Sequence, residues 1–348
     1  MALTCVFGDG FDSYIKANIG QYWTTTGTDT KINTTPGVPR TGLGCLEITS
    51  AAFGPSRVFT ASDKVIAVTA FNPNGLLPSG TKANLLWLVD ATTGSQQVRV
   101  CYEGDASISV YNGNDPFPVK LGQSAAGVLD TGGYNLIVCK ALIGPVGVGS
   151  VQIRCNGVVV LTLTGVKTQV TASAASVDTV QLMAIGGSTA TWHDDTHLWY
   201  WTADADDITG APVIYEFVPV SDSAPIDWTP SVGVNHFACV DEVPPDTTDY
   251  VSSNTVGAVD QYIHGLFAGE NVPPIPASFT VLACIHAMLA ELDAPGAHDL
   301  ASNANGSTSA ASIALTTSYL YRIFARTPGP VTSLATLATT PFGPEITS

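Results

Sequence analysis

Hydrophobic and polar positions along this chain alternate over short distances rather than at helical spacing. In residues 97–103, valine and tyrosine side chains fall on one face of an extended segment, and glutamine, arginine and glutamate fall on the other. A period of two residues is typical of a β-strand whose two faces have different surroundings. Such strand signals recur about every 8–12 residues, as expected of a sandwich or barrel. The pattern therefore predicts an all-β protein.

The strongest local signal is a hairpin within residues 151–164. The apolar runs VQIRC and VVVLTLT flank Asn156-Gly157. This dipeptide accepts a positive φ at both central positions of a two-residue turn. We therefore predict two antiparallel strands joined at these residues.

Several short runs are apolar throughout, which favours strands that are buried on both faces. They are residues 65–71, 85–89, 136–139 and 182–185, and further strands are predicted at 198–201, 213–218 and 259–267. Loops dense in glycine and proline separate these runs, and such a supply of turns suits a jelly-roll architecture.

One segment, ASFTVLACIHAMLAEL at residues 277–292, is compatible with two kinds of structure. Its end contains good helix formers, whereas Phe279, Val281, Ala283 and Ile285 alternate as in a strand. The preceding VPPIP favours an extended entry, because a residue before proline avoids the helical region. We predict a strand here.

The length of 348 residues exceeds that of a usual single domain, so we expect two. The composition changes at residues 219–231, PVSDSAPIDWTPS, which are rich in proline and show no periodicity of their own. We place the boundary there. The predicted organisation is a jelly-roll domain at residues 1–215 and a smaller β-sandwich domain at residues 216–348.

Charge and targeting signals narrow the range of partners. The net charge is −16, from 13 basic and 29 acidic residues, and such a surface repels phosphate backbones, so we expect no nucleic-acid binding. No stretch reaches the ~18–20 apolar residues that span a bilayer, so we expect no membrane insertion. We expect no signal peptide, because no basic region precedes a long apolar run. The seven cysteines lack CxxC spacing, which suits buried thiols in a protein made in a reducing cytoplasm.

The sharpest candidate for chemistry is the run from Trp192 to His197. On a regular strand His193, Asp195 and His197 share one face, and two imidazoles with a carboxylate can hold a divalent transition metal. However, alternate residues lie about 7 Å apart along a strand and rarely converge on one ion. The alternative, which we favour, is that Asp194 and Asp195 cap a loop and that the histidines are partly exposed beside them.

Each of two acidic clusters has a functional and a structural interpretation. Asp204, Asp206 and Asp207 supply hard oxygens for Ca²⁺ but lack the DxDxDG spacing, so a solvated acidic turn is favoured. Carboxylates in the second cluster can form a glycosidase pair only if they face each other across a cleft, and turn caps are favoured. The second cluster contains Asp241, Glu242, Asp246 and Asp249, with Tyr250 beside them.

The remaining candidates are weaker. Cys284 and His286 lie two residues apart on one predicted strand face, where a structural pair is favoured over a catalytic dyad. No GxSxG motif is present, and FGDGF lacks the spacing of a phosphate loop. Trp23 and Trp228 lie near loops, where an exposed ring can stack on a sugar, although core packing is the default. We therefore predict no catalytic residue, no metal site and no cofactor.

A set of short motifs, taken in order, resembles one family. The motifs are FGDGFDSY at residues 7–14, Trp23, RTGLGCL at 40–46, DDTHLWY at 194–200, Trp228-Thr229-Pro230, Asn235-His236, VDE at 240–242, Asp260, and FGPEI at 342–346. In their order and spacing they resemble the minor structural proteins of tailed bacteriophages. The likeness covers nearly the whole chain and departs from the family at residues 327–340, which lack a tryptophan.

The resemblance implies a fold and a setting. The family's first domain is similar to the concanavalin A or laminin-G type of jelly roll, and its second domain to another β-sandwich. It implies a non-enzymatic structural protein, made in the host cytoplasm and attached to other virion proteins on the head or tail exterior, where a homo-oligomer is expected. The alternative is a host-recognition adhesin whose jelly-roll loops bind a cell-surface glycan. A third class, a glycan-degrading enzyme, requires a carboxylate pair in a cleft.

Overall fold

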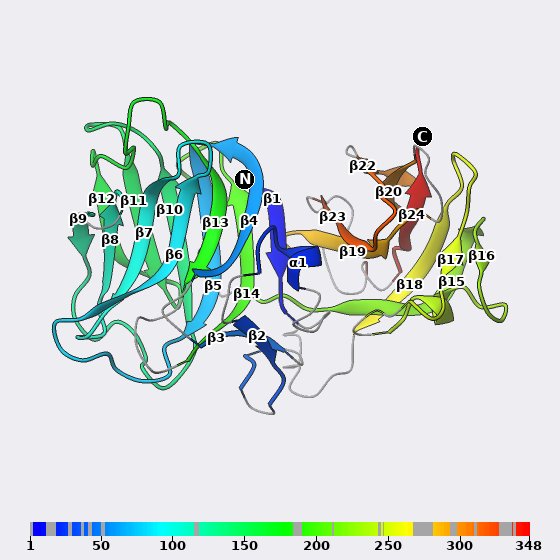
Figure 1. Ribbon diagram of the computed structural model, residues 1–348, viewed down its shortest axis with the longest axis horizontal. Helices are drawn as coiled ribbons and strands as arrows, with labels where there is room; N and C mark the ends of the chain where they lie inside the picture. The colour runs from blue at the N-terminus through cyan, green and yellow to red at the C-terminus, as the bar shows by residue number, and fades with distance from the viewer. Residues whose placement is uncertain are drawn as a thin grey trace. The chain divides into compact units, whose positions relative to one another are not determined.

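The chain forms an all-β structure, shown in Figure 1. This computed structural model describes residues 3–11, 19–26, 30–35, 38–40, 44–49, 53–114, 118–183, 190–210, 212–242, 245, 247–266, 281–292, 298–309, 312–326, 336 and 339–348. The chain divides into two compact units, of which the first ends at Ile214 and the second begins at Tyr215. Each unit is described by itself below.

The first unit contains two antiparallel sheets. The eight-stranded sheet has the order β12-β11-β10-β5-β14-β3-β2, with β1 also pairing with β14, and the six-stranded sheet has the order β4-β13-β6-β7-β8-β9. The first sheet comprises β1 (Thr4–Asp9), β2 (Thr30–Asn33), β3 (Cys45–Ile48), β5 (Lys64–Asn72), β10 (Asn135–Leu142), β11 (Ser150–Cys155), β12 (Val158–Thr164) and β14 (Thr191–Tyr200). The second comprises β4 (Phe53–Ser62), β6 (Lys82–Asp90), β7 (Ser95–Glu103), β8 (Ile108–Asn112), β9 (Val119–Gln123) and β13 (Val177–Met183). A four-residue helix, α1 (Ile19–Tyr22), precedes β2.

The apolar runs of the sequence form the centre of this unit. In β5 every residue after Lys64 is buried, because β10 and β14 flank the strand and both of its faces are covered. The strands predicted at residues 85–89 and 136–139 are confirmed within β6 and β10. The run at 182–185 is a strand up to Met183, and its last two residues lie outside the described part of the chain.

The predicted hairpin is also confirmed. Strands β11 and β12 pair in antiparallel fashion around Asn156 and Gly157, whose φ angles are 51° and 81°. Both values lie in the left-handed region that the turn requires and that asparagine and glycine tolerate. This local rule therefore sets the register of two strands.

The second unit consists of a six-stranded sheet and two short ribbons. The sheet has the order β15-β18-β24-β20-β21, with β22 also pairing with β20, and the ribbons are β16-β17 and β19-β23. The elements are β15 (Phe217–Ile226), β16 (Thr229–Pro230), the 3-10 helix η2 (Phe237–Cys239), β17 (Val251–Ser252), β18 (Asp260–Leu266), β19 (Cys284–Ala290), β20 (Asp299–Ala304), β21 (Ser307–Thr308), β22 (Ile313–Ala314), β23 (Leu320–Arg326) and β24 (Phe342–Ile346).

Aromatic contacts pack the β19-β23 ribbon onto the larger sheet of this unit. The His286 ring on β19 lies 6.2 Å from the His264 ring on β18 and 6.3 Å from the Phe342 ring on β24. The second unit is therefore also a β-sandwich. The strand predicted for the segment at residues 277–292 is confirmed over Cys284–Ala290, which form β19. Residues 281–283 are not in a strand, and residues 277–280 lie outside the described part of the chain.

The prediction of a strand at residues 213–218 is wrong in its bounds. Residues 213–216 are not in a strand, and β15 continues from Phe217 to Ile226 through the proline-rich segment. Proline has no N–H to donate, so it is tolerated on edge strands and at irregularities. Strand β15 meets both conditions, because it ends the sheet and its register with β18 shifts after Pro219 and after Ser223.

Within the described residues, no helix combines the length and apolar character needed to cross a membrane.

Candidate functional site

The outer face of the six-stranded sheet in the first unit carries a row of aromatic and cationic side chains. Trp87 on β6 lies opposite Arg99 on β7, Arg99 lies opposite Tyr111 on β8, and Tyr111 lies opposite Lys120 on β9. Residues directly opposite each other on neighbouring strands project to the same face. This row, together with Lys82, Glu103 and Gln123, is the Tyr111 face.

Tyr111 lies at the centre of this face. The Lys82 Nζ atom lies 3.7 Å from the centroid of its ring, and Lys120 Nζ lies 5.7 Å from it. The hydroxyl donates a hydrogen bond to Glu103 Oε1 at 3.0 Å. Burial raises the pKa of Tyr111 to about 12, and the neighbouring Glu103 carboxylate acts in the same direction. The phenol therefore stays protonated at neutral pH.

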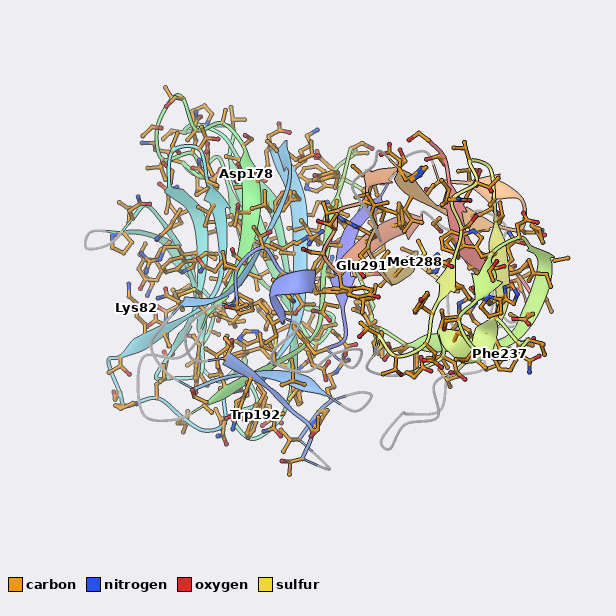
Figure 2. All side chains as sticks on the ribbon, turned by 45° about the vertical axis from the view of Figure 1, so that its right-hand side comes forward. Lys82, Asp178, Trp192, Phe237, Met288 and Glu291 are labelled. Carbon is orange, nitrogen blue, oxygen red and sulfur yellow. The ribbon has the colours of Figure 1, made fainter. Side chains whose placement is uncertain are left out.

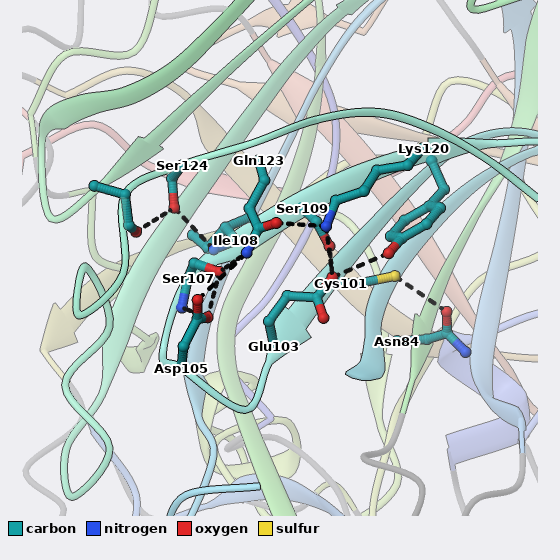
Figure 3. A network of polar contacts seen from close by, with 12 residues as sticks. Asn84, Cys101, Glu103, Asp105, Ser107, Ile108, Ser109, Lys120, Gln123 and Ser124 are labelled. Atoms are coloured by element: carbon teal, nitrogen blue, oxygen red, sulfur yellow. Dashed lines mark hydrogen bonds and ion pairs between the residues drawn. The ribbon is translucent and has the colours of Figure 1, made fainter. Parts of the chain in front are cut away.

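A single oxygen of Glu103 collects several donors, as Figure 3 shows. Glu103 Oε1 accepts hydrogen bonds from the hydroxyls of Ser109 and Tyr111, and Lys120 Nζ lies 3.5 Å away. The contacts with Ser109 and Tyr111 join β7 to its neighbour β8, and the contact with Lys120 reaches across β8 to β9, so the carboxylate links three strands of the face. Charge-assisted hydrogen bonds of this kind are stronger than neutral ones.

The network continues along the edge strand β9. Lys120 Nζ donates to Gln123 Oε1 at 2.5 Å, and Gln123 Nε2 donates to Ser107 Oγ at 2.5 Å (Figure 3). Ser107 in turn donates to Asp105 Oδ1, and this hydrogen bond holds the pKa of the Asp105 carboxyl below its usual value. Lys120 and Gln123 are exposed, so their remaining donors and acceptors face water.

Deeper in the same face, Arg99 is almost fully buried. Its guanidinium lies 4.9 Å from the Trp87 ring centroid and donates to Asn84 Oδ1 at 3.0 Å. Trp87, Arg99 and Tyr111 are at most 8% exposed, so the groups of this face that a polar ligand can meet are the exposed ones, Lys82, Lys120 and Gln123. The sequence placed Arg99 and Glu103 on one strand face correctly, but it gave no sign that Tyr111 and Lys82 join them from neighbouring strands.

The metal site considered for β14 (Trp192, at its second residue, is labelled in Figure 2) is not formed. Asp195 has a φ of 45°, and the register between β14 and β5 shifts between Asp194 and His197. This irregularity breaks the alternation on which the shared face depended. Within the described part of the chain, no group of three or more His, Cys, Asp or Glu side chains is arranged to hold a metal ion.

The alternative interpretation of this run is confirmed for its carboxylates. Asp194 Oδ2 accepts a hydrogen bond from the Arg40 N–H at 2.8 Å, and Asp195 Oδ1 accepts one from the Ile214 N–H at 2.7 Å. The Arg40 guanidinium also forms an ion pair with Asp195. Strand β14 thereby anchors two segments that are distant in sequence.

The histidines of this run are buried, which the expectation of partial exposure missed. His193 bonds to Thr69 Oγ1 and to the Met183 carbonyl, and His197 Nδ1 accepts a hydrogen bond from Trp199 Nε1. Burial lowers the pKa of His193 to about 4. Burial, helped by the Arg40 charge, lowers that of His197 to about 3. Both rings are therefore neutral at physiological pH.

The FGDGF motif is a packing element. Asp9 Oδ1 accepts a hydrogen bond from the Phe11 N–H at 2.7 Å, and Asp9 Oδ2 accepts one from Trp23 Nε1 at 2.6 Å. The Phe11 and Trp23 rings stack with centroids 5.9 Å apart. Trp23 is 1% exposed, so the core role expected by default is confirmed and this ring is not available to a sugar.

The acidic cluster that follows β14 is a turn braced by basic residues. Asp206 Oδ2 accepts hydrogen bonds from the N–H groups of Thr202 and Ala203, and Asp207 pairs with Arg154. Asp206 is 4% exposed, so the favoured solvated turn is wrong in this detail. Of the carboxylates considered for Ca²⁺, those of Asp206 and Asp207 are engaged in the turn, whereas Asp204 is exposed.

Two candidate sites from the sequence lie in the second unit, the carboxylates at residues 241–249 and the pair of Cys284 and His286. Asp241, Glu242 and Asp249 are half-buried and Tyr250 is exposed, while Asp246 lies outside the described residues, so the glycosidase pair stays a hypothesis. His286 Nδ1 lies 3.0 Å from Ser302 Oγ and its ring packs within the sandwich, which favours the structural interpretation of this residue.

A buried triad in this unit has no local signature in the sequence. Asp260 Oδ2 lies 2.8 Å from His236 Nδ1 and accepts the Tyr262 hydroxyl at 2.7 Å. Asp222 accepts the N–H groups of His236 and Phe237, and so fixes the start of η2 (Phe237 is labelled in Figure 2). Burial raises the pKa of Tyr262, and the Asp260 carboxylate reinforces this shift. The triad holds the loop that contains η2 against β18.

Comparison with known proteins gives distant structural likenesses. No protein-family model and no curated protein sequence matches the chain. Among solved structures, the chain is similar to the cellulose-induced protein Cip1, with 14% identity over 55% of this chain and 96% of that one, and a TM-score of 0.40. The alginate lyase Aly36B gives 12% identity over 57% and 96% of the two chains, with a TM-score of 0.42. The endo-β-1,4-glucuronan lyase of Trichoderma reesei gives 13% over 59% and 97%, with a TM-score of 0.38.

These likenesses are distant and concern the fold alone. They are likenesses to concanavalin A-like jelly-roll proteins. Identities of this size carry no information about activity, because one fold serves many unrelated functions.

Proposed function

We propose that this protein is a structural component on the exterior of a tailed phage particle, where it attaches to other virion proteins and turns over no substrate. The ordered likeness of its motifs to phage minor structural proteins supports this setting. The role of the motif residues in the fold supports the absence of chemistry at those positions.

The observation that carries the proposal is that the carboxylates of these motifs form buried hydrogen bonds and ion pairs within the fold. Asp9 binds Trp23, Asp195 binds Arg40, and Asp260 binds His236, and all three carboxylates are at most 3% exposed. A catalytic carboxylate must reach a substrate, directly or through one water. Residues buried in this way stabilise a scaffold instead.

The direct test is to quantify this chain in purified particles. Phage from a density gradient would be analysed by quantitative mass spectrometry, with the major capsid protein as the internal reference and a phage replication protein as the negative control. We expect a fixed number of copies per particle, and a cryo-EM map would then assign them to the head or the tail. Presence in the infected-cell lysate with absence from the particles would contradict the proposal.

A second candidate function, binding of a cell-surface glycan, is favoured by the Tyr111 face. The Trp87 and Tyr111 rings are at most 8% exposed, so the contacts would come from the exposed Lys82 and Lys120 ammonium groups, which can pair with the carboxylate of an acidic sugar. This candidate is compatible with the first, because an exterior virion protein can carry a binding face.

A glycan array with the purified protein would test this second function. Binding that is lost in the double variant K82A/K120A, and retained in K167A, would support it, because Lys167 is also exposed but lies outside the Tyr111 face. Failure of the unmodified protein to bind any glycan would exclude this role for the face, whatever the outcome of the particle analysis.

A further inference from the structure

The edge strand β12 (Val158–Thr164) is unusually apolar for a strand that ends a sheet. Its sequence is VVVLTLT, and within the described part of the chain its one strand partner is β11. Exposed sheet edges offer unpaired N–H and C=O groups to other chains, and natural proteins commonly block them with lysine or proline. Strand β12 contains neither residue.

The core of the first unit is open along this edge. Val158 lies opposite the buried Cys155, and Leu161 lies opposite the buried Ile153, so the side chains of β12 at these positions belong to the inner face of the sheet. Yet Val158 is 65% exposed and Leu161 is only half-buried. Apolar side chains that point inward are therefore left in contact with water.

The exposed apolar surface extends beyond β12 at both sides. Val119 on β9, the edge strand of the other sheet, is 63% exposed, and β9 approaches β12 so closely that a Cβ on Gly122 would lie 2.6 Å from the Leu163 side chain. Val146 and Val148 are 74% and 54% exposed in the loop before β11. Strands β9 and β12 lie at the same end of the first unit in Figure 1. We call β12 with these three valines the β12 strip.

The charge distribution indicates what can approach the β12 strip. The chain has a net charge of −16, so two copies repel each other over most of their surface. Residues 141–153 and 155–166 contain no charged residue, and β12 and the loop before β11 fall within them. Another copy of the same chain can therefore meet this surface without bringing two acidic groups together.

We propose that β12 pairs with β12 of a second copy, antiparallel about a two-fold axis, and joins the two eight-stranded sheets. Leu161–Thr164 is the part of the strand in continuous register with β11, from Ile153 back to Ser150, and it offers a regular ladder. A register shift at the next step, between Ile153 and Arg154, limits the pairing to this half. The second copy covers the exposed valines, and this inference does not depend on the proposed function.

Sedimentation velocity over a range of protein concentrations tests the proposal. One chain has a mass of 36.1 kDa, and we expect the unmodified protein to have twice this mass. The dimer of the exposed-edge variant T162K should have a dissociation constant at least about tenfold higher than that of the unmodified protein. The matched control is T92K, which makes the same change at an exposed residue in the turn between β6 and β7 and should remain dimeric. If T162K does not fold, T164K repeats the test at the next exposed position.

Two results would overturn the proposal. One is an unmodified protein that has the mass of a single chain at 100 μM or above. The other is a T162K protein that self-associates as strongly as T92K. Raising the salt concentration should strengthen association of the unmodified protein, because salt screens the repulsion between two acidic chains.

Discussion

The two sandwich units fill their interiors in different ways. The largest fully buried side chains of the described residues all belong to the first unit, and those of Ile66 and Phe71 lie on the central strand β5. Among the residues of the second unit that the structure describes, eight apolar residues are buried beside six polar ones. The apolar set is Cys239, Ala258, Tyr262, Leu300, Ala301, Phe324, Phe342 and Ile346, and the polar set is His236, Asp260, Gln261, Ser302, Asn303 and Arg322.

This difference indicates what each unit depends on. Apolar burial is non-directional and is lost in proportion to the area exposed, whereas a buried hydrogen bond matters most when its partner is removed. We therefore expect the first unit to be sensitive to cavities and the second to be sensitive to unpaired polar groups. Both units contain buried histidines with lowered pKa values, so both lose stability in acid. Amide hydrogen exchange followed by mass spectrometry reports the stability of each unit from its own peptides.

The largest effect should follow from a cavity in the first unit. Phe71 is fully buried against the rings of Tyr102 and His193, so F71A should lower the free energy of unfolding of this unit by about 3–5 kcal/mol. The matched variant F342A in the second unit should cost less, since Phe342 is 7% exposed and packs on two histidine rings. An equal or larger loss for F342A would contradict the comparison.

The next effect should follow from removing the carboxylate at the centre of the buried triad. Asp260→Ala leaves His236 and Tyr262 without the acceptor they share, and buried donors without partners are costly. We expect faster exchange in peptides of the second unit, equivalent to about 3 kcal/mol, with the first unit unchanged. Asp249→Ala, at a half-buried carboxylate, is the control. Exchange in D260A as slow as in the control would show that the triad does not stabilise this unit.

The smallest effect concerns acid. Burial lowers the pKa of His264 to about 4, against an ordinary value of about 6.5 in the unfolded chain. Between these values the unfolded state binds more protons than the folded state, so the stability of the second unit falls as pH falls from 6.5 toward 4. Replacing the ring by phenylalanine should reduce the drop between pH 7 and pH 4.5 by about 2 kcal/mol.

The control for this acid effect is the first unit. His193 and His197 are unchanged in H264F, so the pH dependence of exchange in peptides of the first unit should match that of the unmodified protein. An H264F protein whose second unit keeps the original slope would assign the acid sensitivity to other groups.

Features that depend on neighbours in sequence were predictable here. The hairpin at Asn156-Gly157 and the apolar centre of β5 follow from local rules on turns and periodicity. The course of β14 was not predictable, because its irregularity coincides with contacts to Arg40 and Ile214, which lie far away along the chain. The Tyr111 face and the Asp260 triad were not predictable from the sequence for the same reason, since each combines side chains from several strands or loops.

The pairing of β14 also determines when the first unit can be completed. Its partners β1, β3 and β5 all precede residue 73, whereas β14 itself begins at Thr191, so the middle of the larger sheet is missing until about 200 residues have been made. At a synthesis rate of ~5–20 residues per second, β5, which ends at Asn72, waits roughly 6–26 s for β14 to be completed. During that interval the edge of β5 that β14 will occupy is open to other nascent chains. A ribosome-bound chain truncated before residue 191 should therefore be the most aggregation-prone stage in the life of this protein.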